Sequence, residues 1–138
     1  MNWQTALKAS VAALAAFWGG LEPLLQALII FMVLDILTGV MAAAAARTVS
    51  SEVSYRGMTK KAIVLLLAGA ATALDANTGL QFGGVQASLA QVVTGFYLMH
   101  EGLSILENAA QAGLPVPRPL KDALLRVGGD TETVAPHD

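Results

Sequence analysis

The sequence contains no cysteine, and charged and aromatic residues are scarce among its 138 positions. Without cysteine, the chain forms no disulfide, thiol nucleophile or cysteine-based metal site. Charged residues make up 13% of the chain and hydrophobic residues 55%, whereas soluble domains have roughly 25% charged residues. The net charge of -2 gives no indication of nucleic-acid binding. The composition predicts an integral membrane protein built as one compact unit.

The longest apolar stretch runs from Leu24 to Ala46, with Asp35 at its midpoint. A helix of about 20 residues crosses the roughly 30 Å hydrocarbon core of a bilayer. An ionised aspartate near the middle costs about 2.5–3.5 kcal/mol and normally faces protein or water. Asp35 is therefore the leading candidate for a functional intramembrane residue. The alternative is a purely structural role, in which Asp35 pairs inside the monomer, for example with Thr38, or is protonated.

Three further apolar segments accompany this span. Residues Trp3 to Trp18 form a short segment that either crosses the membrane or lies in its interface as an amphipathic helix. Residues Ala62 to Leu74 span only if Lys60 and Lys61 reach out to the membrane surface. The fourth segment runs from Val85 to about Leu106. We therefore predict an all-α membrane bundle of about four short helices.

The placement of basic residues predicts the topology. The loop Arg47 to Lys61 holds four basic residues and one acid, whereas the loop Asp75 to Gly84 holds no basic residue. Because cytoplasmic loops are enriched in Lys and Arg, the first loop and both termini are expected in the cytoplasm. Residues 1–127 are expected to form a single membrane-embedded domain, followed by a flexible polar tail over 128–138.

The fourth segment has a polar stripe at helical spacing. A polar face on a membrane helix meets either another helix, through hydrogen bonds, or water in a pore, and both interpretations stay open. Together with Asp35, these groups are hard to satisfy within four small helices, which favours assembly of several copies. The intramembrane polar candidates are Asp35, Thr38, Gln91, Thr94, Glu101 and Ser104.

Motifs typical of enzymes and metal sites are absent from the sequence. His100 is next to Glu101, but only His137 in the tail could join them as a ligand, so a metal is not expected. No nucleophile elbow, phosphate-binding loop or zinc pattern occurs. We therefore expect no catalytic residue and no cofactor.

Three blocks resemble the phage holin family that includes the clostridial toxin-secretion holins. They are LDILTG from Leu34 to Gly39, a serine-containing stretch with Gly57 and the pair Lys60-Lys61, and the long block from Glu101 to Leu124. The resemblance covers roughly residues 34–125. Its structural motif residues in this sequence are Gly39, Gly57, Lys60, Lys61, Glu107, Asn108, Pro115 and Pro117.

The resemblance implies a homo-oligomer that permeabilises the bacterial inner membrane. Its functional partner is an endolysin, an antiholin is a candidate partner, and related members serve toxin or protein release. The alternatives are a non-pore membrane scaffold or binding module and a small channel or transporter. The tail has fewer charges than many holins have, which leaves tail-based control of timing unsupported.

The last membrane helix is expected to end within Gly113 to Pro117, because proline cannot continue a helix and glycine suits a helix stop. Glu107 and Asn108 would then lie at the inner membrane surface. Lys60 and Lys61 are interpreted as topology signals rather than as ligands of another side chain.

Overall fold

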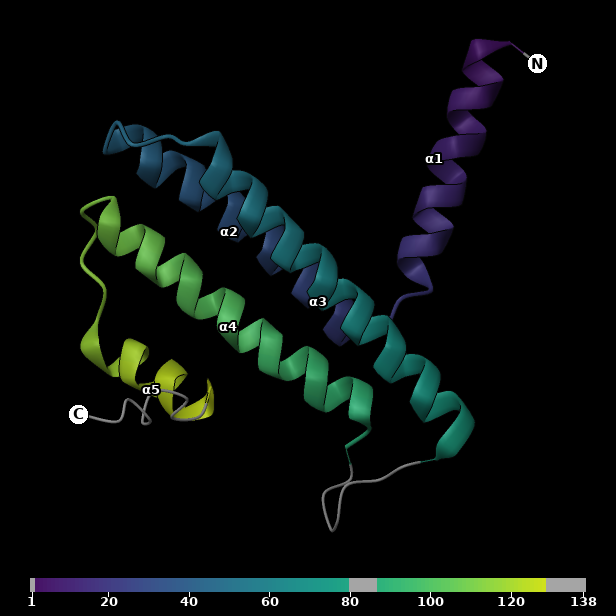
Figure 1. Ribbon diagram of the computed structural model, residues 1–138. Coiled ribbons are helices and arrows are strands. Elements are labelled where there is room, and N and C mark those ends of the chain that lie inside the picture. Colours follow the sequence, from purple (N-terminus) through teal and green to yellow (C-terminus); the bar gives the residue numbers. More distant parts are fainter. Residues whose placement is uncertain (1, 80–86, 129–138) are drawn as a thin grey trace.

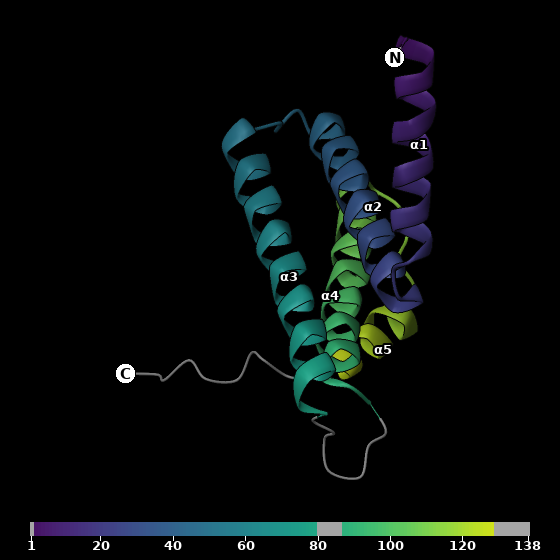
Figure 2. The same cartoon turned by 90° about the vertical axis from the view of Figure 1, so that its right-hand side faces the viewer.

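The structure, a computed structural model, describes residues 2–79 and 87–128. Within these residues the chain forms helices and no strand, so the predicted all-α class is confirmed for them. Helices α2, α3 and α4 lie side by side, α1 projects away from them, and α5 folds back beside α4 (Figure 1, Figure 2). The helices are α1 (Trp3–Gly19), α2 (Pro23–Ala45), α3 (Ser51–Thr78), α4 (Leu89–Gln111) and α5 (Arg118–Gly128).

Helix α2 begins and ends where local chemistry dictates. Pro23 occupies its first turn, where the missing N–H would have no partner inside the helix. At the other end Arg47 takes a left-handed conformation with φ of 53°. The N–H of Thr48 then bonds to the carbonyl of Ala43 at 2.9 Å, and that of Arg47 to Ala44 at 3.2 Å. These two bonds form a Schellman motif, which ends the helix. The residue with positive φ is arginine rather than glycine, so this conformation costs free energy.

Helix α3 is much longer than predicted. The polar stretch before Lys61 was expected to be a loop, but the helix begins at Ser51 and the connection from α2 covers only 46–50. The polar residues of this stretch interact at helical spacing. Arg56 forms an ion pair with Glu52 at 2.9 Å, and the hydroxyl of Thr59 donates to the Tyr55 carbonyl. The prediction of a 13-residue segment was wrong because charged residues were taken as loop formers.

Helix α4 is the central element of the bundle. It packs against α2, α3 and α5. Gln91 on α4 bonds to Glu22, just before α2, and Asn108 meets Gly39, so α2 and α4 run parallel. Small side chains let α3 approach α4 closely. The buried apolar side chains are Leu28, Met32 and Ala42 of α2, Ala68 and Ala71 of α3, and Ala90 of α4.

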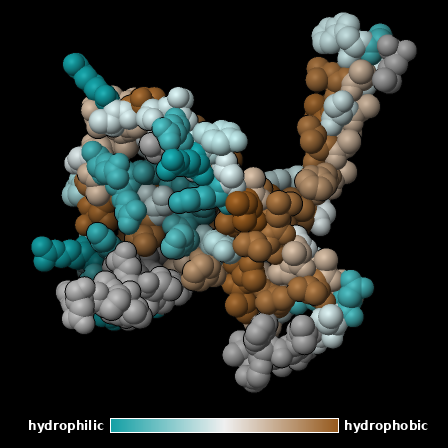
Figure 3. Space-filling model, in the orientation of Figure 1, coloured by the Kyte–Doolittle hydropathy of each residue, from teal (hydrophilic) through white to brown (hydrophobic). Residues whose placement is uncertain are grey.

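Two helices among the described residues are long and apolar enough to cross a membrane. They are α2 and the part of α3 from Ser54 to Thr78. Figure 3 shows hydrophobic residues over the middle of the bundle and hydrophilic residues gathered toward the end with the α2–α3 connection. Helix α4 is more polar but lies along both spans. These helices indicate a membrane protein.

Helix α1 stands apart from the three packed helices. It has 17 residues and no buried side chain, and its exposed side chains include Trp3 (73% exposed) and Leu14 (68% exposed). The expected bundle of four helices is thus a bundle of three, with α1 outside it. Whether α1 crosses the membrane stays a prediction, as does the cytoplasmic location of the termini.

The predicted stop after the last long helix is confirmed. Helix α4 ends at Gln111, and Gly113 adopts a φ of 87°. The N–H groups of Gly113 and Leu114 bond to the carbonyls of Ala110 and Ala109, each at 3.0 Å, which forms a second Schellman motif. Pro115 and Pro117 lie in the non-helical link to α5. Most of the predicted tail, 129–138, and residues 80–86, including the predicted start at Val85, lie outside the described residues.

Candidate functional site

Three charged side chains from three different helices meet in the middle of the bundle. The Lys61 ammonium of α3 binds Oδ2 of Asp35 on α2 at 2.7 Å, and it also binds Oε2 of Glu101 on α4. Each of the three lies ten residues from the helix end nearest the α2–α3 connection. At about 1.5 Å per residue, they share a level about 15 Å below that end. We call Asp35, Lys61 and Glu101 the ion cluster.

The ion cluster is nearly enclosed by protein. The side chains are 14% exposed for Asp35, 15% for Lys61 and 11% for Glu101. Two carboxyl groups face one ammonium group, so the cluster has one more acid than base. Among the described residues, every buried side-chain nitrogen or oxygen has a hydrogen-bond partner. A charged layer that would be costly in lipid is therefore compensated within a single chain.

Asn108 holds the second oxygen of Asp35 and ties α4 to α2. Its Nδ2 donates to Oδ1 of Asp35 at 2.8 Å, to the Asp35 carbonyl at 3.2 Å and to Oγ1 of Thr38 at 3.0 Å. A Cβ added at Gly39 would lie 3.4 Å from this nitrogen, so glycine makes room for the amide. Thr38 in turn donates to the Leu34 carbonyl at 2.8 Å. Asn108 of α4 thus contacts α2 within the Leu34–Gly39 block.

A second polar site fixes the start of α4. Asp75 near the end of α3 accepts the backbone N–H groups of Leu89 at 3.0 Å and Ala90 at 2.7 Å. Ser88 and Gln91 form a capping box at the same helix start. Negative charge beside the first turn also suits the helix dipole. Asp75 was expected only to mark a membrane end, and its role as a cap supplied by a neighbouring helix was missed.

The interpretation of Lys61 as a topology signal was wrong. Lys61 does not reach out to a membrane surface, because it lies on the inward face of α3 and binds two carboxylates. Lys60, its neighbour, is exposed. A usable signal was present in the sequence: Gly57, Lys61, Val64, Ala68, Ala71 and Asp75 recur at spacings of four and three and form one helix face.

The remaining candidates divide between the interior and the surface. Thr94 and Glu101 are buried, and Ser104 and Asn108 are half-buried. Gln91 is exposed at the start of α4. The predicted stripe is therefore only partly enclosed by the bundle. Glu101 and Asn108 point toward the neighbouring helices, where they bind Lys61 of α3 and Asp35 of α2. Thr38 does not bond to the Asp35 carboxylate, since its hydroxyl donates to the backbone carbonyls of Leu34 and Asp35.

Asn108 is half-buried three residues before the end of α4 and binds Asp35 of α2. Its location at the inner membrane surface stays a prediction. Glu107 is exposed, and Gly57 is half-buried on the inward face of α3. The premise that Asp35 and Glu101 need further copies for satisfaction was also wrong, since Lys61 satisfies both. Within residues 2–79 and 87–128, no three His, Asp or Glu side chains gather as a metal site requires.

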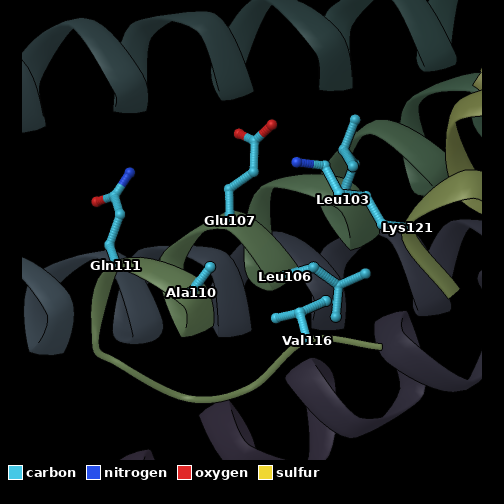
Figure 4. A pocket seen from close by; sticks show the side chains of 7 residues that line it. All are labelled: Leu103, Leu106, Glu107, Ala110, Gln111, Val116 and Lys121. Carbon is cyan, nitrogen blue, oxygen red and sulfur yellow. The ribbon is translucent and has the colours of Figure 1, made fainter. Parts of the chain in front are cut away.

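A cavity of about 420 Å³ lies between α4 and the segment that leads into α5. In Figure 4, Leu106 of α4 lies close to Val116 of the link, while Glu107 and Gln111 point to the other side. Lys121 of α5 also lines the cavity. The cavity is mainly a consequence of the helix stop at Gly113, which turns the chain back along α4.

The fold and the ion cluster define a class: a small helical membrane protein with a charged layer enclosed by three helices. The chain belongs to the bacteriophage holin family, whose model matches residues 12–128. The resemblance seen in the sequence is thereby confirmed.

Relatives extend over most of the chain. A probable holin of Bacillus phage phi105 is 32% identical over 83% of this chain and 81% of its own. An uncharacterised 14.9 kDa protein of Clostridium perfringens is 39% identical over 70% of each chain. An uncharacterised protein of Halalkalibacterium halodurans is 32% identical over 94% of this chain and 95% of its own. No solved structure matches the chain.

Proposed function

We propose that this protein is a holin that assembles from several copies in the bacterial inner membrane and permeabilises it. Release of an endolysin, or of another protein, would follow from that permeabilisation. Family membership supports a holin role generally. The observation that carries the proposal further is the ion cluster, which lies at one level among three helices, two of which, α2 and α3, expose many apolar side chains.

The ion cluster explains how a single copy can reside in a bilayer without opening it. Lys61 compensates charges that lipid would not solvate, and Asn108 satisfies the other oxygen of Asp35. Helix α4 packs directly on α2 and on α3, and the side chains of the ion cluster fill the place where the three helices meet. A path wide enough for a protein must therefore lie between copies, which makes homo-oligomerisation part of the proposal.

The proposed topology places the α2–α3 connection and α5 in the cytoplasm. Arg47 and Arg56 lie at that end of the bundle. The start of α5, which contains Arg118 and Lys121, lies at the same end (Figure 1). Because basic residues favour the cytoplasmic side, a cysteine at Ser51 should be protected from impermeant reagents outside cells. A cysteine at Thr78 should be labelled from outside, and the opposite pattern would reject this orientation. An α1 helix that lies flat would place residue 2 outside.

Release is the direct test of function. The chain is expressed with an endolysin in bacterial cells, and membrane potential, dye entry and culture turbidity are followed. We expect depolarisation, dye entry and lysis, whereas the endolysin alone should leave turbidity unchanged. Membrane insertion without any dye entry or lysis would favour the non-pore scaffold. Selective movement of one small solute would favour a channel or transporter.

Asp35 gives a sharper test of the site. Asp35→Leu leaves the Lys61–Glu101 pair balanced but deprives Asn108 of its carboxylate partner. We expect Asp35→Leu to change lysis timing strongly and Asp35→Asn to change it less, because asparagine keeps size and hydrogen bonding. The two variants are compared at matched membrane levels. Native timing in Asp35→Leu would show that the acid has no part in assembly or opening.

A further inference from the structure

Helix α4 has a second exposed face, which includes polar side chains that the ion cluster does not use. Its members lie at spacings of four and seven, so at about 100° per residue they fall within about 100° of one another around the helix. All of them are exposed, whereas Glu101 and Asn108 are buried or half-buried and lie about 100° around the helix from His100 and Glu107. This set, which we call the outer face of α4, consists of the apolar Val92 and Phe96 and the polar His100, Glu107 and Gln111.

The depth of the outer face makes its polarity significant. His100 is adjacent in sequence to Glu101 and so lies at the level of the ion cluster. Helix α4 cannot lie outside the membrane if α2 and α3 span it, because Asp75 binds its start and Asn108 binds Asp35 near its other end. His100 therefore faces outward at the depth where α2 and α3 present apolar side chains.

Lipid provides no hydrogen bonds to an imidazole or a carboxylate at that depth. The neighbouring aromatic ring offers only partial cover: Phe96 stacks on His100 with ring centres 5.8 Å apart. Glu107 lines the cavity beside α5 together with Lys121, so the end of the outer face already adjoins polar groups. The outer face needs water or a polar surface that a single copy does not supply.

We propose that the outer face of α4 lines the water-filled path between assembled copies of this chain. The inference rests on the proposed holin function and specifies which surface of the protein meets the lumen. It differs from an assignment to the stripe with Thr94 and Glu101, because those two side chains are buried within one copy. In the assembly, α2 and α3 face lipid and α4 faces the centre.

Because the chain has no cysteine, single cysteines give a clean test. His100→Cys and Glu107→Cys probe the outer face, and Leu37→Cys and Leu66→Cys are matched controls at exposed apolar positions of α2 and α3. Cells that express each variant are treated with a membrane-impermeant cationic methanethiosulfonate. Modification is measured by the mass shift, and permeabilisation by dye entry.

We expect the two outer-face cysteines to react once dye enters, at least about tenfold faster than the controls, because the reactive thiolate forms in water and not in lipid. Modification should also slow dye entry. If His100→Cys prevents assembly, Glu107→Cys provides the same readout.

Two results would overturn the proposal while leaving the holin function intact. One is dye entry with outer-face cysteines no more reactive than Leu66→Cys. The other is rapid disulfide formation between copies through His100→Cys, with no access for the reagent, which would mean a dry contact between copies. Failure of the native chain to admit dye would instead remove the holin function and the lumen with it.

Discussion

Helices α2 and α4 have the same length, 23 residues, and run parallel in contact with each other, yet they differ in their outward surfaces. The outward side of α2 is apolar, with Ile30, Val33 and Leu37 exposed. The outward side of α4 includes His100 and Glu107. Of these two helices, only α2 is long and apolar enough to qualify as a span.

The difference shows that polar residues have two separate roles on α4. Glu101 and Asn108 face inward and are satisfied by Lys61 and Asp35 within the same chain. The outer face is left for surroundings that the single copy does not provide. Substitutions on the inner side should therefore change the stability of the fold, and those on the outer side should change release.

The largest effect is expected for Lys61→Met. Removing the ammonium leaves two buried carboxyl groups without their cation, and breaking a buried ion pair in this way costs about 3–5 kcal/mol. The free energy of unfolding in detergent and the amount of protein in the membrane should both fall. Lys60→Met is the control, since Lys60 is exposed one position away. Equal effects of the two changes would refute the assignment of Lys61 to the ion cluster.

A smaller effect is expected for Asn108→Ala. The change leaves Oδ1 of Asp35 without its donor and should cost about 1–3 kcal/mol. Glu107→Ala, one residue earlier and exposed, should leave the unfolding free energy within about 0.5 kcal/mol of the native value. Unchanged unfolding and unchanged dye entry in Asn108→Ala would show that its contacts to α2 have no energetic role.

Asp75→Ala tests the connection between α3 and the start of α4. Two backbone N–H groups lose their acceptor, and loss of a capping side chain costs about 0.5–2 kcal/mol. Hydrogen exchange should accelerate at Leu89 and Ala90 but not near Glu101. Uniform acceleration along α4 would mean that Asp75 supports the whole bundle rather than the helix start.

The smallest effect on stability is expected for His100→Leu. His100 is exposed and stacks on Phe96 of the same helix. A substitution at such a surface position changes the free energy of unfolding by about 0.5 kcal/mol or less, so unfolding should remain native-like. Dye entry should nevertheless change, because the variant makes the outer face of α4 resemble that of α2. A large loss of stability would place His100 in the fold instead.

The sequence predicted those features that depend on local pattern. The apolar stretch around Asp35, the helical spacing of Thr94 and Glu101, and the stop at Gly113 all follow from spacing, proline and glycine. Each of these features depends on residues close together in the chain, so the predictions needed no information on which helices pack together.

The roles of Lys61 and Asp75 depend on which helices meet. A lysine before an apolar run is typical of a membrane border, and only the extension of α3 back to Ser51 places it ten residues inside the helix. The sequence likewise showed no partner for Asp75. Its carboxylate accepts hydrogen bonds from the backbone N–H groups at the start of α4, which begins 14 residues later. The residue patterns did not contain the information on which helices pair.

The position of Lys61 in the chain has a consequence for biosynthesis. Asp35 leaves the ribosome 26 residues before Lys61, and Glu101 follows 40 residues after Lys61. Until α3 emerges, α2 would enter the bilayer with an uncompensated acid, at a cost of about 2.5–3.5 kcal/mol. Once Lys61 arrives, it pairs with Asp35, and Glu101 completes the layer only when α4 is made. Stable integration of α2 is thus coupled to synthesis of the helices that follow it. A chain truncated before α3 would therefore insert α2 into the membrane less stably.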